Sequence, residues 1–336
     1  MAWTRQGGFL MQGIVYDSQA DGHPLSLTEV ETPALVPGSV RIEVAATAVN
    51  RADLMQRRGL YPPPPGASPL LGLECSGVVT EVAEGVSQWS PGDRVMALLP
   101  GGGYAEQVVV QAGHCLRVPE RVDLVEAAAL PEVLLTVFLN VFELAGLKSR
   151  DWVLVHGGGS GIGTAAIQLA AAADAKIAVT AGSPEKCARC LDLGADLAIN
   201  YREEDFAEAI ATATEGQGVS VILDSIGASY LTPNLASLAV GGRLVLIGLM
   251  GGAKAEVPLG SLLMRRLQII GSTLRTRSDT EKSELVHAFE ARFGEAVEAG
   301  RIRPIVDRVL PLAEADEAHR IMQASEHFGK LVLQVR

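Results

Sequence analysis

A glycine-rich segment at residues 152–170 reads WVLVHGGGSGIGTAAIQLA, with an apolar run before the glycines and a helix-forming run after them. Within it, Gly159, Ser160, Gly161 and Ile162 belong to G-S-G-I-G, which matches the GxGxxG spacing only in part. Small residues let a backbone approach a pyrophosphate, and the free N–H groups of a helix N-terminus bind its negative charge. The segment predicts a dinucleotide-binding turn. The alternative is a tight strand-to-helix turn whose glycines serve packing alone.

The choice between NAD and NADP depends on the end of the next apolar run, residues 176–180, which continues A-G-S-P-E-K. No acidic residue stands at that tip to bind a ribose 2′-hydroxyl. Gly182 and Ser183 follow the run, where the serine can donate to a 2′-phosphate, and Lys186 supplies a positive charge. Glu185, in the first turn of a helix, is expected to face solvent. The pattern favours NADPH, and the alternative for Lys186 is an ordinary exposed helix lysine.

Other candidate cofactor contacts follow the later apolar runs. Tyr201 has a ring that can stack near the adenine end, and Ser225, Gly248, Leu249 and Met250 stand just after two further runs. Ligands of open parallel sheets bind outside the carboxyl ends of the strands. We therefore expect these residues at the cofactor, with simple turn chemistry as an equal alternative for the last four.

The elements that must position these residues alternate between strand-like runs and helical segments over residues 126–272. Such alternation is typical of a doubly wound parallel sheet, so the fold class predicted is α/β with a Rossmann-like domain. The expected strands are 152–156, 176–180, 197–200, 219–224, 243–247 and 267–271, and the expected helices are 161–173, 185–193, 203–214 and 229–239.

Residues 11–125 have a different character. Short β-rich runs at 40–44, 77–82, 94–98 and 105–110 are separated by Gly, Pro and Asp, which predicts a compact β-dominated domain. Two stretches, Pro62–Gly66 and Gly101–Gly103, are expected to be functional loops.

The remaining segment, residues 273–336, shows a helix at 280–299, a run at 302–311, a helix at 313–324 and a strand at 330–335. Such a segment does not extend a parallel sheet. We expect it to return and complete the first domain, which makes the Rossmann-like domain an insertion. Residues 1–10 are expected to be an N-terminal extension.

Composition limits the function classes. The chain has 336 residues, of which 48% are hydrophobic and 20% charged, so two globular domains are expected. A net charge of −11 with scattered Lys and Arg disfavours nucleic-acid binding. The longest apolar runs fall short of the roughly 20 residues that cross a bilayer, and no secretory signal opens the chain. These features predict a cytoplasmic protein without a membrane segment.

The four cysteines are Cys75, Cys115, Cys187 and Cys190, too few and too uneven for a disulfide framework. Cys187 and Cys190 form CxxC, but no second CxxC or His pair lies nearby in the sequence. We interpret them as small residues of a helix, with a redox or metal role as the less favoured alternative.

Several stretches together resemble a known family. They are N-R-A-D-L-M-Q-R at 50–57, Y-P-P-P-P-G at 61–66, L-G-L-E-C-S-G-V-V at 71–79, G-D-R-V at 92–95, G-G-G-Y-A-E at 101–106, H-G-G-G-S-G-I-G-T-A-A-I-Q at 156–168, T-A-G-S at 180–183 and L-M-G-G at 249–252. Over residues 11–336 the chain resembles the quinone oxidoreductase branch of the medium-chain dehydrogenase/reductase superfamily. It looks closest to the tumour-suppressor-induced quinone oxidoreductase subgroup, with zeta-crystallin a more distant relative.

The resemblance implies a GroES-like catalytic domain split around a Rossmann domain, with NADPH in the cleft between them. It also implies homodimers, or a tetramer of such dimers, joined through the Rossmann edge at residues 267–274, with 257–263 beside it. Zinc-dependent relatives carry a Cys, a G-H-E motif and a later Cys or Asp as catalytic ligands, plus a lobe of four cysteines. Here Leu73 replaces the His of G-H-E, Asn50 stands at the first Cys, and 92–114 holds no cysteine. No metal site is expected, and Glu74 is interpreted as a buried acceptor.

Without a metal to polarise a carbonyl, the substrate must itself be electrophilic, as quinones and enones are. Tyr61, at the start of the proline-rich loop, is the best candidate to hydrogen-bond the acceptor oxygen; alternatively it only packs on the cofactor. By resemblance, Asn50 and Asp53 would bind the nicotinamide end or fix the loop, and Thr136 would contact the carboxamide. The protein must align the nicotinamide with its acceptor and exclude water.

The function predicted is NADPH-dependent, zinc-independent reduction of quinones or similar electrophilic carbonyl compounds. One alternative is an NADPH-dependent 2-alkenal or enoyl reductase. Another, of a different class, is a non-catalytic NADPH-binding protein of the crystallin or RNA-binding type, against which the acidic balance argues.

Overall fold

The computed structural model describes residues 9–17 and 19–336, so most of the predicted N-terminal extension, residues 1–8, lies outside the described residues. The chain forms two compact units. The first unit contains the chain up to Glu132 together with Arg275–Ala291 and Pro304–Arg336, and the second contains Val133–Leu274 and Arg292–Arg303. Each is described separately below.

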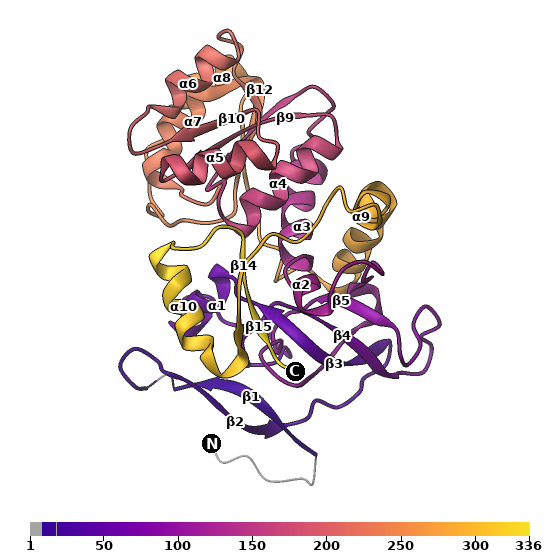
Figure 1. Ribbon diagram of the computed structural model, residues 1–336. Coiled ribbons are helices and arrows are strands. Elements are labelled where there is room, and N and C mark those ends of the chain that lie inside the picture. Colours follow the sequence, from indigo (N-terminus) through magenta and orange to yellow (C-terminus); the bar gives the residue numbers. More distant parts are fainter. Residues whose placement is uncertain (1–8, 18) are drawn as a thin grey trace. The chain divides into compact units, whose positions relative to one another are not determined.

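The second unit is built on a six-stranded parallel sheet with the order β10-β9-β8-β11-β12-β13. Figure 1 labels β9, β10 and β12 of this sheet. The order reverses direction beside β8, which places the carboxyl ends of β8 and β11 next to each other. The strands are β8(Trp152–His156), β9(Lys176–Ala181), β10(Leu197–Asn200), β11(Val219–Asp224), β12(Leu238–Leu246) and β13(Gln268–Gly271). This is the predicted doubly wound sheet, although β12 begins five residues before the expected 243.

Helices connect these strands as the sequence pattern predicts. Ser160 and Ser183 accept hydrogen bonds from the first turns of α4 and α5, and Asp205 does so for α6, which explains where these helices begin. The helices are α4(Gly161–Ala172), α5(Pro184–Leu193), α6(Phe206–Ala213), α7(Leu231–Ser237) and α8(Leu259–Arg265), with a 3-10 turn η3(Ala228–Tyr230) before α7. Only α8 was not expected as a helix.

The first unit contains a seven-stranded sheet with the order β14-β15-β3-β4-β5-β7, in which β6 also pairs with β3. All pairs are antiparallel except β14 with β15. A separate hairpin is formed by β1(Leu10–Tyr16) and β2(Leu25–Glu31). The sheet strands are β3(Ser39–Ala48), β4(Glu74–Val82), β5(Arg94–Leu98), β6(Gln107–Gln111), β7(Cys115–Arg117), β14(Val306–Pro311) and β15(Lys330–Gln334).

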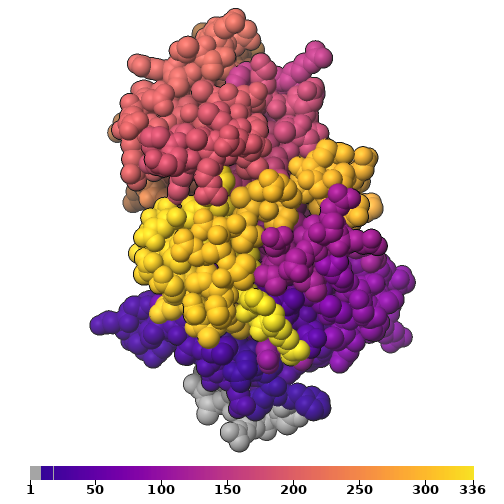
Figure 2. Space-filling model, viewed as in Figure 1, coloured from indigo at the N-terminus to yellow at the C-terminus, as the bar shows by residue number. Residues whose placement is uncertain are grey.

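The late strands of this sheet come from the return segment. Strand β15 lies between β14 and β3, so the last strand of the chain pairs with one of the earliest. Helix α10(Ala315–Ala324), with the short turn η4(Leu312–Glu314) before it, contributes to the same core as α1(Arg51–Arg57), and its residues form part of the first unit's surface, in yellow in Figure 2. A short turn η1(Ala112–His114) precedes β7.

The return segment differs from expectation in one respect. Helix α9(Asp279–Glu298) contributes to both units, and residues 292–303 belong to the second. The reason is an aromatic cluster in which the Phe293 ring lies 5.9 Å from Phe138 and 5.2 Å from Phe142. In addition, Gln168 exchanges two hydrogen bonds with the backbone of Arg303.

The expected helical run at 127–144 is divided into α2(Leu124–Ala127), α3(Pro131–Val137) and a π-helical segment η2(Phe138–Leu144). Pro131 begins α3 because proline lacks the N–H that a helix interior needs. By length and composition alone, Leu124–Leu144 is the one described helical stretch that would suit a membrane span, contrary to the estimate from the apolar runs. Its apolar window is 78% buried within the protein, and a core helix passes the same test.

Candidate active site

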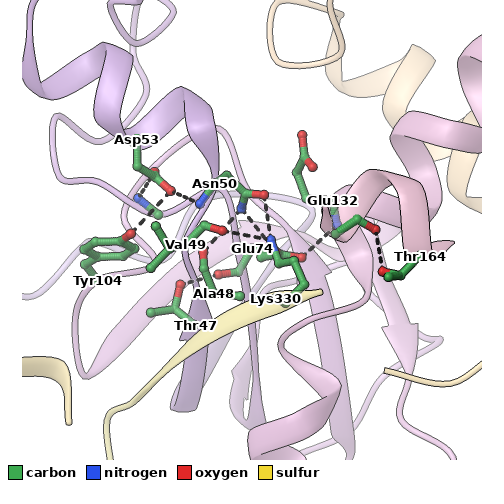
Figure 3. Close-up of polar contacts among 12 residues, drawn as sticks. Thr47, Ala48, Val49, Asn50, Asp53, Glu74, Tyr104, Glu132, Thr164 and Lys330 are labelled. Carbon is green, nitrogen blue, oxygen red and sulfur yellow. Dashed lines mark hydrogen bonds and ion pairs between the residues drawn. The ribbon is translucent and has the colours of Figure 1, made fainter. Parts of the chain in front are cut away.

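A buried lysine joins Asn50, one of the predicted catalytic residues, to Glu74 (Figure 3). Lys330, the first residue of β15, is 3% exposed, and its Nζ donates to Glu74 Oε1 at 2.7 Å, to Asn50 Oδ1 at 2.7 Å and to the Val49 carbonyl at 3.0 Å. Asn50 Nδ2 donates to the same Glu74 oxygen at 2.8 Å. The other Glu74 oxygen accepts from the Glu132 backbone N–H at 2.9 Å. This network joins the N-terminus of α1 to β4, β15 and the start of α3.

Asp53 forms a second branch of the same buried cluster. Its carboxylate accepts from the backbone N–H of Asn50 at 2.8 Å and of Gly72 at 2.9 Å, and from the Tyr104 hydroxyl at 3.3 Å. Burial raises the pKa of Asp53 to about 6, although the two N–H donors and Lys330 lower it. The Asp53 bond to Gly72 ties the start of α1 to the loop that precedes β4. Contact with the nicotinamide stays a prediction.

Tyr104 extends this branch to the return segment. Its hydroxyl lies 3.1 Å from His319 Nε2 of α10, and both residues are buried. Burial lowers the pKa of His319 to about 3, with nearby Arg57 and Arg58 adding to the effect, so the imidazole is neutral. The buried polar cluster thus extends from Lys330 through α1 to α10.

Tyr61 lies in the loop after α1 and is half-buried. The Arg275 guanidinium lies over its ring, with Cζ 5.4 Å from the ring centroid, and donates to the Tyr61 carbonyl at 3.2 Å. Burial raises the pKa of the Tyr61 phenol. At neutral pH the phenol is therefore a hydrogen-bond donor.

The glycine turn of the second unit follows β8 and opens α4. Ser160 accepts from the Gly163 N–H at 3.0 Å as the cap of α4, so Gly161 and Ile162 form the first turn of that helix. A side chain at Gly163 would come within 2.4 Å of two backbone carbonyls, and Gly157 has a φ of +81°. The turn thus requires glycine at 157 and 163, whereas the sequence pattern drew attention to Gly159 and Gly161. A glycine turn that opens a helix in this way leaves backbone N–H groups free to bind an anion, and pyrophosphate binding there stays a prediction.

A buried polar chain supports this turn, and the sequence analysis missed it. Thr180 donates to His156 Nδ1 at 3.1 Å, and His156 Nε2 bonds Asn234 Oδ1 at 2.7 Å. Asn234 in turn donates to Asp224 Oδ2 at 3.0 Å. Burial lowers the pKa of His156 to about 4, so the ring is neutral and Nδ1 can accept. The chain connects the carboxyl ends of β8, β9 and β11.

The region predicted to hold a 2′-phosphate lies at the start of α5. A side chain at Gly182 would come within 2.7 Å of the Tyr201 hydroxyl, so the Tyr201 side chain lies directly against this glycine. Ser183 accepts from the Lys186 backbone N–H at 3.3 Å. Glu185 is exposed, as expected, but its carboxylate accepts from its own N–H and from the Ser183 hydroxyl, and both bonds lower its pKa. The Ser183 hydroxyl, which was expected to donate to a 2′-phosphate, therefore donates to the Glu185 carboxylate.

The remaining candidates lie in two places in the second unit. Thr136 is buried in α3, where its carbonyl accepts from Asn140 at 2.7 Å. The carbonyl of Ser225 accepts from the Met250 N–H at 3.2 Å, and a side chain at Gly248 would contact Ser225 at 2.9 Å. Leu249 and Met250 are more than half exposed. The structure thus brings Ser225 and Gly248–Met250 together after β11 and β12.

Comparison with known proteins shows two family matches. Residues 36–120 match the alcohol dehydrogenase GroES-like domain, and residues 161–290 match the zinc-binding dehydrogenase family. The quinone oxidoreductase of Rattus norvegicus is 30% identical over 308 residues, which cover 91% of this chain and 92% of that protein. This chain belongs to the medium-chain dehydrogenase/reductase superfamily.

Other known proteins are similar to nearly the whole length of this chain. A crystal structure of a Pseudomonas syringae quinone oxidoreductase is 27% identical with a TM-score of 0.86, covering 97% of this chain and 100% of that one. The CurK enoyl reductase structure is 29% identical with a TM-score of 0.84, covering 97% and 99%. A mycocerosic acid synthase-like polyketide synthase of Mycobacterium tuberculosis is 35% identical over 301 residues, 89% of this chain but 14% of that protein.

These matches confirm the predicted fold class, a GroES-like domain with a Rossmann-like parallel sheet. Relatives of comparable length are described as a quinone oxidoreductase and a quinone oxidoreductase-like protein, and members of the medium-chain superfamily bind a nicotinamide cofactor. For the polyketide synthases, the chain spans about a seventh of their length.

One matching family is described as zinc-binding, yet the residues here do not fit zinc. Leu73 is a buried apolar side chain, and the Asn50 and Glu74 side chains are bonded to the Lys330 ammonium. Tetrahedral zinc needs three or four N, S or O ligands. Among residues 9–17 and 19–336, no group of three or more His, Cys, Asp or Glu side chains is placed to hold a metal ion.

The sequence analysis missed four residues of this site: Lys330, Tyr104, His319 and Arg275. All four are polar residues buried at long sequence distances from their partners, so no local motif names those partners. A signal for Lys330 did exist, because a lysine opening an otherwise apolar strand is rarely buried without a carboxylate partner.

Proposed function

We propose that the protein reduces quinones, or similar electrophilic carbonyl compounds, with hydride from NADPH and without zinc. The observation that carries this proposal is the Lys330 ammonium bonded to Asn50 and Glu74. By the resemblance, zinc relatives have catalytic ligands at these sequence positions, so a cation of the chain itself stands there. An ammonium fixed in this way does not polarise a carbonyl as a Lewis acid does. The acceptor must therefore be electrophilic without metal activation.

The two units have different tasks in this proposal. Ser160, Gly161 and Ile162 bind the pyrophosphate, and Thr136 contacts the carboxamide. Bound NADPH supplies the hydride from its nicotinamide. In the first unit, the Tyr61 hydroxyl donates to the acceptor oxygen, while Asn50 and Asp53 hold the loops that carry the site.

The preference for NADPH rests on Lys186 and Ser183 at the start of α5, with Tyr201 beside Gly182. A 2′-phosphate must displace the Glu185 carboxylate from the Ser183 hydroxyl, and it gains the N–H groups of the helix N-terminus and the charge of Lys186. We therefore expect a moderate preference for NADPH over NADH.

A second candidate activity is enoyl reduction, in which hydride adds to a carbon–carbon double bond conjugated to a carbonyl. The similarity to the CurK enoyl reductase favours it. An enone places negative charge on its carbonyl oxygen during reduction, as a quinone does, so Tyr61 serves both reactions. The two candidates differ in the acceptor they prefer.

We also propose that the protein is a homodimer joined through the edge of the second unit's sheet. β13 is an edge strand, and α8 beside it exposes Leu259, Leu263 and Met264 by more than 70% each. Exposed apolar side chains next to an open strand edge mark an association surface. Light scattering after gel filtration should give a dimer for the wild type and a monomer for Leu263→Arg, with Leu191→Arg as a control. A cytoplasmic location stays a prediction.

The test of the proposed reaction is a steady-state assay of NADPH and NADH oxidation with a panel of quinones and enones. Tyr61→Phe should lower kcat, and Lys186→Ala should raise KM for NADPH alone, with the exposed Lys148→Ala as its control. Preference for enones over naphthoquinones would favour the enoyl reductase. Binding of NADPH without turnover of any acceptor would favour a non-catalytic protein. Stoichiometric zinc in the purified protein, or a preference for NADH, would refute the proposal in its present form.

A further inference from the structure

Arg275 holds three separate segments of the first unit together. Its guanidinium donates to Gln56 Oε1 at 2.7 Å, to the Pro100 carbonyl at 2.8 Å and to the Tyr61 carbonyl at 3.2 Å. These acceptors belong to α1, to the segment before the glycine loop 101–103 and to the start of the proline-rich loop. Arg275 is 5% exposed and Gln56 is 1% exposed.

All three acceptors are neutral, so the positive charge of Arg275 has no direct partner. Among the described residues, no carboxylate oxygen lies within ion-pair distance of it, whereas buried charges are normally paired. The titratable groups that affect it from further away are Asp53, the phenols of Tyr61 and Tyr16, and the neighbouring Lys282. Burial lowers the pKa of Arg275, but an arginine side chain stays protonated in proteins.

The unpaired charge faces Tyr61. The guanidinium carbon lies 5.4 Å from the centre of the Tyr61 ring. Burial is the main cause that raises the pKa of the Tyr61 phenol, Glu132 adds to it, and Arg275 opposes both. A cation at this distance makes the phenol a stronger donor as negative charge develops on its acceptor.

We propose that Arg275 is a positioning and specificity residue whose unneutralised charge strengthens the Tyr61 hydrogen bond to an acceptor oxygen that becomes negative during reduction. This inference rests on the proposed function. In that reaction a quinone takes hydride from NADPH to give a hydroquinone anion and NADP⁺, and the anion then takes a proton from water. An enone takes hydride at its β-carbon and gives an enolate. The site therefore selects acceptors whose reduction passes through an oxyanion.

The test neutralises the charge without removing the arginine. Gln56→Glu is nearly isosteric and places a carboxylate against the same guanidinium nitrogen, 2.7 Å away in the wild type, and it gives up only the Gln56 hydrogen bond to the Pro69 carbonyl. We expect kcat with a naphthoquinone to fall about tenfold or more, with KM for NADPH unchanged. The matched variant Arg275→Lys keeps the charge and loses most of the hydrogen bonds, and it should retain more activity than Gln56→Glu. If the arginine served only to hold the loops, the order would be reversed.

A second readout does not depend on turnover. Fluorotyrosine is incorporated, and the fluorine NMR signal of Tyr61 is identified by its loss in Tyr61→Phe. Gln56→Glu should shift the titration of this signal to higher pH, and Arg275→Lys should shift it less. An unchanged titration in Gln56→Glu together with wild-type kcat would overturn the inference. If Tyr61→Phe itself were fully active, the failure would lie with the proposed function instead.

Discussion

Replacing Lys330 with methionine should destabilise the first unit by about 3–5 kcal/mol. The side chain of Lys330 is 4% exposed and that of Glu74 is 0% exposed, so the variant leaves a carboxylate buried without its cation. It also removes three hydrogen bonds of 2.7 to 3.0 Å. Methionine fits the volume of the lysine stem, so the loss comes from charge and hydrogen bonding and not from a cavity.

The matched control is the double variant Lys330→Met with Glu74→Gln. A glutamine at 74 can still accept from the Glu132 N–H, and its amide can donate to Asn50 Oδ1, which the lost ammonium frees, once the Asn50 amide turns over; neither charge of the pair then stays buried. We expect the double variant to lie within about 2 kcal/mol of the wild type, because uncharged replacements of buried ion pairs are often tolerated. The coupling between the two sites should then be at least about 2 kcal/mol.

The assay is urea unfolding followed by the fluorescence of Trp89, which lies in the first unit and is 8% exposed. A background with Trp3→Phe and Trp152→Phe leaves Trp89 as the one remaining tryptophan of three, which matters because two compact units need not unfold in one step. A loss below about 1 kcal/mol for Lys330→Met, or a double variant as unstable as the two single variants added together, would refute the reasoning.

Three further predictions concern other parts of the structure. Gly158→Ala places a methyl group 2.7 Å from Val179 and 2.9 Å from Cys190 Sγ. The affinity for NADPH, measured by fluorescence titration, should therefore fall about tenfold. Gly260→Ala is the control: its methyl group meets nothing within 4 Å, so the affinity should not change. Asp53 has a pKa raised from 3.8 to about 6, so it stabilises the fold fully below pH 3.8 and this contribution, about 3 kcal/mol at most, is lost as pH rises through 6. Asp53→Asn should remove that slope from urea midpoints measured between pH 4 and 6.5; an identical slope in both proteins would contradict it. The four cysteines are free and buried, and burial raises the pKa of each thiol, that of Cys190 to about 12. Ellman's reagent should therefore react slowly with the native protein and leave activity intact, and rapid inactivation would restore a redox role for the CxxC pair.

The sequence predicted the second unit well because its signals are local. Apolar runs bounded by caps such as Ser160, Ser183 and Asp205 define the strands and helices to within a few residues. The limits of β12 were less accurate, because its register with β11 shifts between Val219 and Val221. Residues 292–303 were assigned to the wrong unit, since nothing in their sequence shows that Phe293 meets Phe138 and Phe142.

The candidate site was only half visible from the sequence. Asn50, Asp53 and Tyr61 were found through their motifs, but the motifs did not show what these side chains contact. Lys330 lies 280 residues from Asn50 and 256 from Glu74, and Arg275 lies 219 residues from Gln56. Pairings at such distances depend on how β15 enters the sheet and leave no periodic signal. The Glu185 bond to Ser183 was missed for a different reason, because its rotamer decides it.

The position of β15 between β14 and β3 has a consequence for biosynthesis. Val49 leaves the ribosome 281 residues ahead of Lys330, which at about 5–20 residues per second is a delay of roughly 15–60 s. During that interval the nascent β3 lacks its pairing with β15, and Glu74 lacks the Lys330 ammonium. The inserted second unit can already fold. Until β15 emerges, one side of β3 is an unpaired edge, so translation speed should influence the yield of native protein.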